Sequence, residues 1–255
     1  MRGLDRPVTE VAATALLCRT SDRSAEGSLG AVGLSALTGA RQVGAPATPR
    51  VGRWDSDLRD SRGCLLEAGG QVDDALSVGR RPLLLAGDCS IALSTLPVVA
   101  RHRPDAWICW IDAHADFNTP STSPSGFLGG MPLAAACGLW ESGFGAGVDP
   151  AQVAMLGVRD VDGGERVLLE VNGVGRPDGP EALTGLPVFV HLDLDVLDPS
   201  ALPAPFAAPG GWSFERLAQV LAAVADGGEL IGAEVTSAHP AHVEQIHAAI
   251  APLID

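Results

Sequence analysis

Short apolar runs alternate with longer stretches of amphipathic or Ala/Leu-rich sequence along the chain. Short runs bounded by turn-forming residues are typical of buried strands, whereas the longer periodic stretches are typical of helices. The predicted strands are 13–18 (ATALLC), 82–87 (PLLLAG), 106–112 (AWICWID), 153–158 (VAMLGV), 188–195 (VFVHLDLD) and 230–235 (LIGAEV). The predicted helices are 63–79, 90–102, 130–138, 213–227 and 240–253.

Strands that alternate with helices predict an α/β fold, because each crossover helix lets the next strand run in the same direction. We therefore expect a three-layer α/β/α sandwich with a mostly parallel sheet, built as a single domain over residues 1–255. The Pro/Ser/Gly-rich segments 117–130 and 198–213 each follow a predicted strand directly. They should form loops at the carboxyl edge of the sheet, where open α/β sheets bind their ligands.

Composition narrows the classes of function. The formal net charge of -14 repels phosphate backbones and anionic lipid surfaces, so it disfavours nucleic-acid and membrane partners and favours metal ions or a cationic small molecule. No apolar stretch reaches the roughly 18 residues of a membrane-spanning helix. The N-terminal sequence MRGLDRPVTE lacks the pattern of a secretory signal. We expect a soluble, cytoplasmic protein.

The cysteines show no pattern of a disulfide framework or of a CxxC metal motif. They are odd in number and scattered, so all are expected to be reduced thiols. They are Cys18, Cys64, Cys89, Cys109 and Cys137.

Two predicted strands end in closely spaced acids. WIDAHADF places Asp112, His114 and Asp116 two residues apart, and HLDLDVLDP does the same for Asp193 and Asp195. Side chains two apart share a face if the extended conformation continues. Buried carboxylates that crowd together repel one another unless a cation neutralises them, so the pattern predicts a metal site rather than a set of turn-forming acids.

One imidazole among several carboxylate oxygens suits manganese better than zinc. Two bridging carboxylates would hold two ions close enough to share and activate one water molecule.

These motifs resemble the ureohydrolase family, which comprises arginases, agmatinases and their relatives. The resemblance runs from AEGSLGAVGL near residue 30 to IGAEVTSAHP near residue 240. It implies two Mn2+ ions per chain, bridged by Asp112 and Asp193. By the resemblance, one ion takes Asp112, Asp116, Asp193 and the residue at position 89, and the other takes Asp112, His114, Asp193 and Asp195.

Position 89 departs from the family, which has a histidine ligand where this chain has Cys89 in AGDCS. We expect a thiolate ligand there, because a helix that begins at Ser90 would help to stabilise its charge. The alternative is that Cys89 is a small buried residue and that the first metal site is degraded. A thiolate would make the metal ions weaker Lewis acids, which suits a substrate more reactive than ordinary guanidinium.

The resemblance also implies an α-amino acid substrate. It assigns the substrate carboxylate to Asn118, Ser123 and Ser125, the α-amino group to Asp162 and Glu165 with Asp160 in support, and the guanidinium end to Glu234. Asp116 and Glu234 are the residues expected to act in catalysis.

A second departure is Gly129, where arginases carry a histidine that shuttles a proton. An Nω-hydroxylated guanidine is less basic and more easily attacked than arginine, whose guanidinium stays protonated above about pH 12. Cys89 and Gly129 together favour hydrolysis of Nω-hydroxy-L-arginine to L-ornithine and hydroxyurea. The chain therefore looks like the branch of the family that acts on hydroxyarginine in D-cycloserine (antibiotic) biosynthesis.

Several alternatives stay open from the sequence. An ordinary arginase would make ornithine and urea from L-arginine, and an agmatinase-type amidinohydrolase is less well matched. Zinc deacetylases share the expected fold but use one metal ion, and a decayed enzyme could serve as a metal-binding module. Arginase trimers rely on chain beyond the last helix, and this sequence ends at Ile254 and Asp255, so a monomer is favoured over a trimer.

Overall fold

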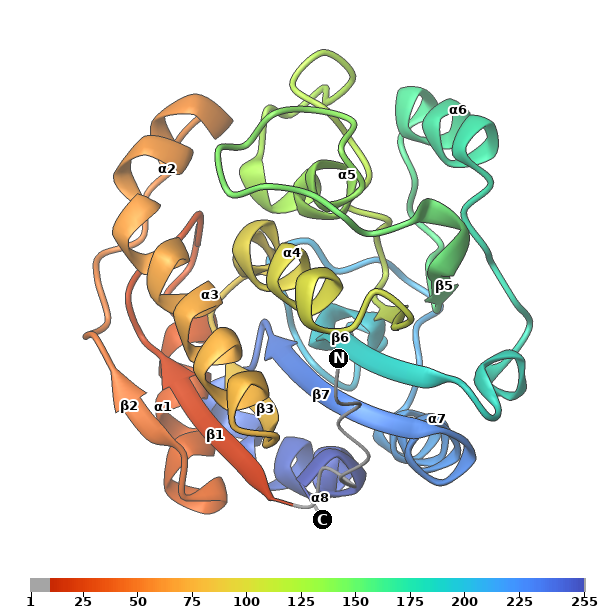
Figure 1. The fold of residues 1–255 in the computed structure, drawn as a ribbon. Helices are drawn as coiled ribbons and strands as arrows, with labels where there is room; N and C mark the ends of the chain where they lie inside the picture. Colours follow the sequence, from red (N-terminus) through yellow and green to blue (C-terminus); the bar gives the residue numbers. More distant parts are fainter. Residues whose placement is uncertain (1–9, 255) are drawn as a thin grey trace.

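A seven-stranded parallel sheet forms the centre of the computed structural model, which describes residues 10–254 (Figure 1). Each pair of neighbouring strands is parallel, and the spatial order is β2-β1-β3-β7-β6-β4-β5. The expectation of a parallel α/β sheet is confirmed. The strands are β1 (Val11–Leu16), β2 (Arg41–Val43), β3 (Arg81–Leu85), β4 (Trp107–Ile111), β5 (Val153–Leu156), β6 (Pro187–Asp193) and β7 (Glu229–Thr236).

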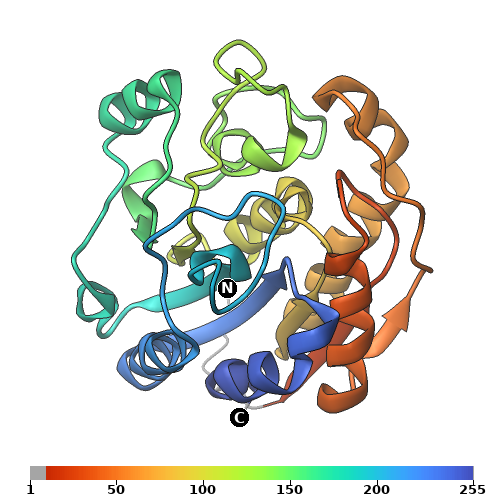
Figure 2. The ribbon, with the colours of Figure 1, turned by 180° about the vertical axis from the view of Figure 1, so that it is seen from behind.

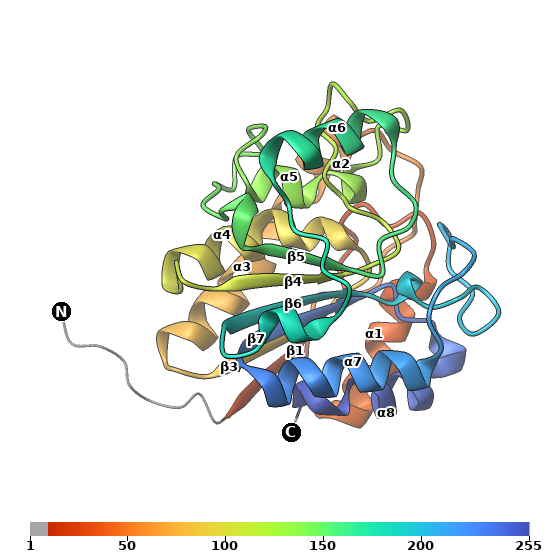
Figure 3. The same cartoon turned by 90° about the vertical axis from the view of Figure 1, so that its right-hand side faces the viewer.

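Helices cover both faces of the sheet, as the sandwich prediction requires. Figure 3 shows α3, α4 and α5 on one face and α1, α7 and α8 on the other, and Figure 2 shows the second group from its own side. No helix within residues 10–254 is long and apolar enough to cross a membrane. The helices are α1 (Glu26–Thr38), α2 (Trp54–Asp60), α3 (Arg62–Ser77), α4 (Ala92–His102), α5 (Pro132–Ala136), α6 (Gly163–Asn172), α7 (Phe214–Gly227) and α8 (Val243–Ile254).

Two apolar layers hold the sheet between its helices. Along β4, Cys109 packs into the layer shared with α1, α7 and α8, while the next residue, Trp110, packs into the layer shared with α3 and α4. Both side chains are fully buried. A strand buried on both faces consists of nearly continuous apolar residues, which is why the sequence pattern could predict these strands.

Some elements escaped the sequence pattern. The edge strand β2 has only three residues, and helices α1, α2 and α6 were not predicted. Helix α1 carries glycine at positions 27, 30 and 33, which weakens both its helical propensity and its amphipathic pattern. A Cβ atom added at Gly30 would lie 2.2 Å from the Ala238 carbonyl oxygen. The glycine therefore lets α1 approach the chain that follows β7.

The expectation of five free thiols was wrong for two cysteines. Cys18, just beyond β1, forms a disulfide with Cys64 in α3. The two cysteines lie 46 residues apart, and no local sequence pattern predicts their pairing, because it depends on α3 packing near the end of β1. Cys89, Cys109 and Cys137 are free.

Candidate functional site

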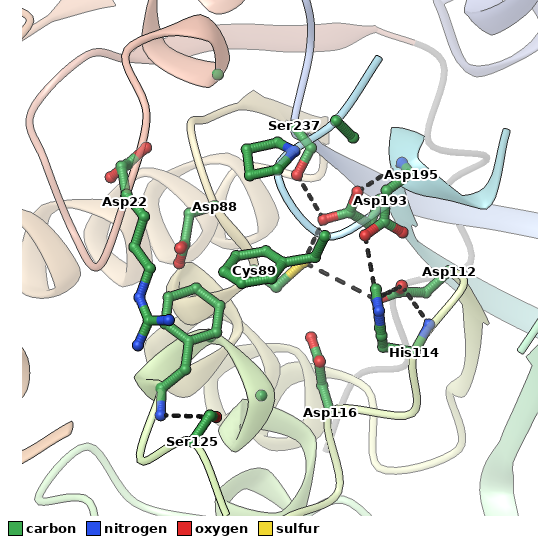
Figure 4. Close-up of a pocket in the computed structure, with 18 of the residues that line it drawn as sticks. Asp22, Asp88, Cys89, Asp112, His114, Asp116, Ser125, Asp193, Asp195 and Ser237 are labelled. Atoms are coloured by element: carbon green, nitrogen blue, oxygen red, sulfur yellow. Dashed lines mark hydrogen bonds and ion pairs between the residues drawn. The ribbon is translucent and has the colours of Figure 1, made fainter. Parts of the chain in front are cut away.

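A cavity of about 220 Å3 opens at the carboxyl edge of the sheet (Figure 4). It is lined by the segments that follow β1, β3, β4, β5, β6 and β7, and both Pro/Ser/Gly-rich loops, 117–130 and 198–213, contribute to its walls. Because all the strands are parallel, their carboxyl ends meet at this one edge. The loop prediction is confirmed.

The first acid cluster reaches the cavity through a loop rather than through a continued strand. Strand β4 ends at Ile111, so the extended conformation that would align Asp112, His114 and Asp116 on one face does not continue. The Asp112 carboxylate instead accepts a hydrogen bond from the backbone N–H of His114 (2.7 Å). Asp116 has a left-handed backbone (φ 47°), uncommon for a non-glycine residue, and its side chain stands apart from the Asp112–His114 pair in Figure 4.

The second acid cluster meets the first across neighbouring strands. Asp193 is the last residue of β6, and Asp195 lies in the short 3-10 turn that follows. The Asp195 Oδ2 atom is 3.0 Å from His114 Nδ1, and the Asp112 Oδ1 atom is 3.4 Å from the same nitrogen. One ligand atom from each of Asp112, His114 and Asp195 lies within 4.8 Å of the others, so these three residues could hold a metal ion.

Cys89 begins the short 3-10 turn that precedes α4 and points toward the same carboxylates. Its Sγ is 2.7 Å from Asp193 Oδ2 and 4.0 Å from Asp112 Oδ2. Cys89, Asp112 and His191 form a second group that could hold a metal ion. Because Asp112 belongs to both groups, the two possible ion positions are neighbours.

The electrostatics of this cluster demand positive charge. Burial, reinforced by Asp195 and Asp193, raises the pKa of Asp112 well above its usual range. Burial acts to lower the pKa of His114, but contacts with Asp112 and Asp195 outweigh it and raise that pKa to about 12. Burial and the neighbouring acids likewise raise the pKa of the Cys89 thiol, so its thiolate needs a cation. The donor set fits divalent metal ions.

Behind Cys89 lies a fully buried polar chain. His191 Nε2 is 3.3 Å from Cys89 Sγ, and His191 Nδ1 is 2.6 Å from Glu234 Oε1. The Thr95 hydroxyl donates to the other Glu234 oxygen (2.6 Å), and the His191 ring stacks on Trp110 with centroids 3.6 Å apart. His191 is thus a packed, hydrogen-bonded core histidine. Glu234 is not among the residues that line the cavity, so the structure separates it from the expected substrate contacts.

The other expected substrate residues do line the cavity, and they also hold its loops in place. Asn118 Nδ2 donates to Asp162 Oδ2 (3.0 Å). Asp162 and Glu165 form a reciprocal capping box at the start of α6, and Glu165 accepts from the Phe117 backbone N–H (2.7 Å). The remaining pair, Ser123 and Ser125, caps backbone N–H groups within loop 117–130.

Several residues of the cavity were not predicted from the sequence, among them Arg23, Phe127, Phe206 and Ser237. Ser237 donates to Asp193 Oδ2 (2.6 Å) and so fixes the carboxylate that faces Cys89. The order of elements could have indicated Arg23 and Ser237, since each closely follows a predicted strand whose end lies at the site.

Sequence comparison identifies the family of this chain. The sequence model of the Arginase family matches residues 43–177 and 179–252, which is most of the chain. This chain belongs to the arginase family. Its two aspartate motifs lie in the paired arrangement described above, and the resemblance drawn from the sequence implies a histidine ligand where this chain has Cys89.

Individual family members show the extent of the similarity. The Nω-hydroxy-L-arginine amidinohydrolase of Streptomyces lavendulae is 39% identical over 222 residues, covering 84% of this chain and 81% of that enzyme. The arginase of Bacillus caldovelox is 33% identical over 202 residues, covering 66% of this chain and 64% of that enzyme. The crystal structure of arginase from Bacillus cereus superposes with a TM-score of 0.83 at 25% identity, covering 96% of this chain and 98% of that one.

Proposed function

We propose that this arginase-family protein is a binuclear manganese hydrolase that cleaves the guanidino C–N bond of Nω-hydroxy-L-arginine, giving L-ornithine and hydroxyurea. The observation that carries the proposal is the 39% identity, over 84% of the chain, to a Streptomyces enzyme named for this substrate. Cys89 beside Asp193 and the missing side chain at Gly129 support it, because both depart from the arginase pattern in the direction of a more reactive substrate.

The residues proposed to hold the two ions surround Asp112. Cys89 and Asp116 would hold one ion and His114 and Asp195 the other, and Asp112 and Asp193 are proposed to be shared by both. Bound manganese would supply Lewis acidity and an activated water for attack on the guanidino carbon. The chain itself contributes fixed donors, since backbone N–H groups hold Asp112, Asp193 and Asp195 in place before any ion binds.

Substrate orientation follows from the charges on the cavity wall. Ten acidic side chains line the cavity, which favours the positively charged ammonium group of an amino acid. Asp162 and Glu165 are the proposed ammonium partners. The polar groups of Asn118, Ser123 and Ser125 lie on loop 117–130 and are proposed to receive the carboxylate. Agmatine has no carboxylate, so this loop favours an α-amino acid over an agmatinase substrate.

The test compares ornithine release from Nω-hydroxy-L-arginine and L-arginine by the manganese-reconstituted protein. A strong preference for the hydroxylated substrate is expected, and hydroxyurea should appear in equal amount to ornithine. Asp195→Asn, which removes a proposed ligand, serves as the inactive control. Equal or faster turnover of L-arginine would identify an ordinary arginase, and metal content without turnover of either compound would identify a binding module.

Three further expectations stay predictions: a cytoplasmic location, a monomeric state and a role in antibiotic biosynthesis. A single zinc ion per chain, as in the deacetylases, is disfavoured by family membership.

A further inference from the structure

Three side chains from three separate segments form one wall of the cavity. Phe127 and Phe206 pack with ring centroids 4.8 Å apart, and the guanidinium carbon of Arg23 lies 4.5 Å from the Phe127 centroid and 5.6 Å from that of Phe206. We call this group the Arg23–Phe127–Phe206 wall. It joins the chain after β1 to the loops after β4 and β6.

The wall explains why position 129 is glycine. A Cβ atom added to Gly129 would lie 2.6 Å from Phe127 Cε1 and 2.7 Å from Phe127 Cζ, far inside contact distance. On its other side it would meet Asp88 Oδ2 at 3.2 Å. The backbone of Gly129 does not need glycine, because this residue is absent from the positive-φ set that includes Gly126. The Phe127 ring therefore occupies the space that a side chain at position 129 would need.

Other contacts hold the ring in that place. The Phe127 backbone N–H donates to Ser125 Oγ (3.2 Å), and Gly126 before it turns with φ 62°. The loop that carries Phe206 is tied at both ends by Asp198, which accepts from the backbone N–H groups of Ser200 and Gly210 (3.0 Å each). Moving the ring away from Gly129 would break packing from two other segments.

Arg23 strengthens this arrangement. Among residues 10–254, no carboxylate lies within ion-pair distance of Arg23, although ten acids line the same cavity. Its guanidinium is held by the faces of two aromatic rings instead, an interaction that gains strength where water is excluded.

We propose that Phe127 is a specificity-determining residue. Its ring closes the space beside Gly129 and so gives the reacting end of the substrate an apolar wall in place of a side chain that could exchange protons. The wall also carries the positive charge of Arg23, so a guanidinium, which holds its proton tightly, is disfavoured beside it. A less basic hydroxyguanidine is accepted. This inference rests on the proposed function and deepens it, because it names the residue that separates the two substrates.

The steric part is tested without any substrate. Gly129→Ala, Phe127→Ala and the double variant are compared with the parent by thermal unfolding. Gly129→Ala is expected to lower the melting temperature by several degrees in the parent and to have little effect once Phe127 is alanine. Equal effects in both backgrounds would show that the ring does not occupy the space at position 129, and would overturn the inference.

The specificity part is tested by placing histidine, which exchanges protons near neutral pH, at position 129. Gly129→His and the double variant Phe127→Ala/Gly129→His are assayed with hydroxyarginine and arginine. The preference for hydroxyarginine, as a ratio of kcat/KM values, is expected to fall about tenfold or more in the double variant, as for a contact of about 1–3 kcal/mol. An unchanged ratio in a folded, metal-loaded double variant would overturn the inference.

Phe144→Ala is the matched control, because Phe144 lies under the Arg62 guanidinium (5.1 Å) but does not line the cavity. It should leave the substrate ratio unchanged. If the parent enzyme shows no activity on hydroxyarginine, the proposed function fails, whereas the unfolding comparison still decides whether Phe127 controls position 129.

Discussion

Cys89 is a buried thiol beside buried carboxylates, and a bound cation would offset the negative charge of this cluster. Its sulfur contacts Asp193 at 2.7 Å and lies close to Asp112 and His191, and burial raises the pKa of its thiol. Metal binding must therefore remove a proton that the metal-free site holds firmly. A substitution at Cys89 should therefore change metal affinity directly, and any change in catalysis should follow from that.

We expect Cys89→Ser to lower the manganese content from two ions per chain toward one, because a serine hydroxyl is a far weaker ligand than a thiolate. Elemental analysis after dialysis measures the change. Cys109→Ser is the control, since Cys109 is also a fully buried free cysteine but lies in the apolar core. Retention of two tightly bound ions in Cys89→Ser would show that the sulfur is not a ligand.

His191 makes a separate prediction about stability. His191→Ala would leave one oxygen of the buried Glu234 carboxyl group without a partner and would open a cavity against Trp110. The free energy of unfolding should fall by about 3 kcal/mol. Urea unfolding measures it, with the partly exposed His242→Ala expected to change stability by less than about 0.5 kcal/mol. A small effect of His191→Ala would mean that the polar chain behind Cys89 contributes little.

At the scale of residues, the sequence could predict the two aspartate motifs because their spacing is local. It could not predict the turn at Asp116, which depends on a left-handed backbone, or the burial of Glu234 behind His191. It also gave no sign that Phe127 fills the space at Gly129, since that contact depends on Arg23 and Phe206 from distant segments.

Among the elements, the strands were predicted best, because burial on both faces makes them continuously apolar. Strand β2 is exposed along most of its three residues and gave no such signal. Helix α6 begins with two glycines, and α1 contains glycines on its packing face. Glycine has low helical propensity, so the local sequence did not predict either helix. Their formation depends on tertiary contacts that a local pattern does not contain.

Two helical glycines should therefore respond in opposite ways to alanine. Gly30→Ala in α1 would drive a Cβ atom into the Ala238 backbone, and we expect it to lower the free energy of unfolding by about 2 kcal/mol. Gly70→Ala in α3 has open space around it and should raise stability by about 0.5–1 kcal/mol through helical propensity alone. Chemical denaturation of both variants decides the matter, and a stabilising Gly30→Ala would refute the packing argument.

For the whole molecule, two acids on the cavity wall make stability depend on pH. Burial, with help from Asp88, raises the pKa of Asp22 to about 6, and burial raises that of Glu165 to about 7. Both carboxyl groups hold a proton more tightly in the folded than in the unfolded chain. Their contribution to stability is complete below about pH 4 and is lost as the pH rises through 6 to 7.

The metal-free protein should therefore become less stable between pH 5 and pH 8. Glu165→Gln should flatten this decline, because glutamine does not titrate, although its single side-chain oxygen can replace only one of the two acceptors that the Phe117 and Asp162 backbone N–H groups use. Urea unfolding across that range, with metal removed, measures both effects. A stability that rises with pH in the metal-free protein would contradict the assignment of these two groups.

The strand order also determines when the site can exist during synthesis. Strand β7, the last to be made, lies in the middle of the sheet between β3 and β6, and it brings Glu234, Thr236 and Ser237 to the back of the metal ligands. A nascent chain in which Asp112, His114 and Asp195 have already been synthesised still lacks the central strand of its sheet. Capture of the proposed metal ions is thus expected only after β7 has left the ribosome, so a chain truncated before β7 should not fold around manganese.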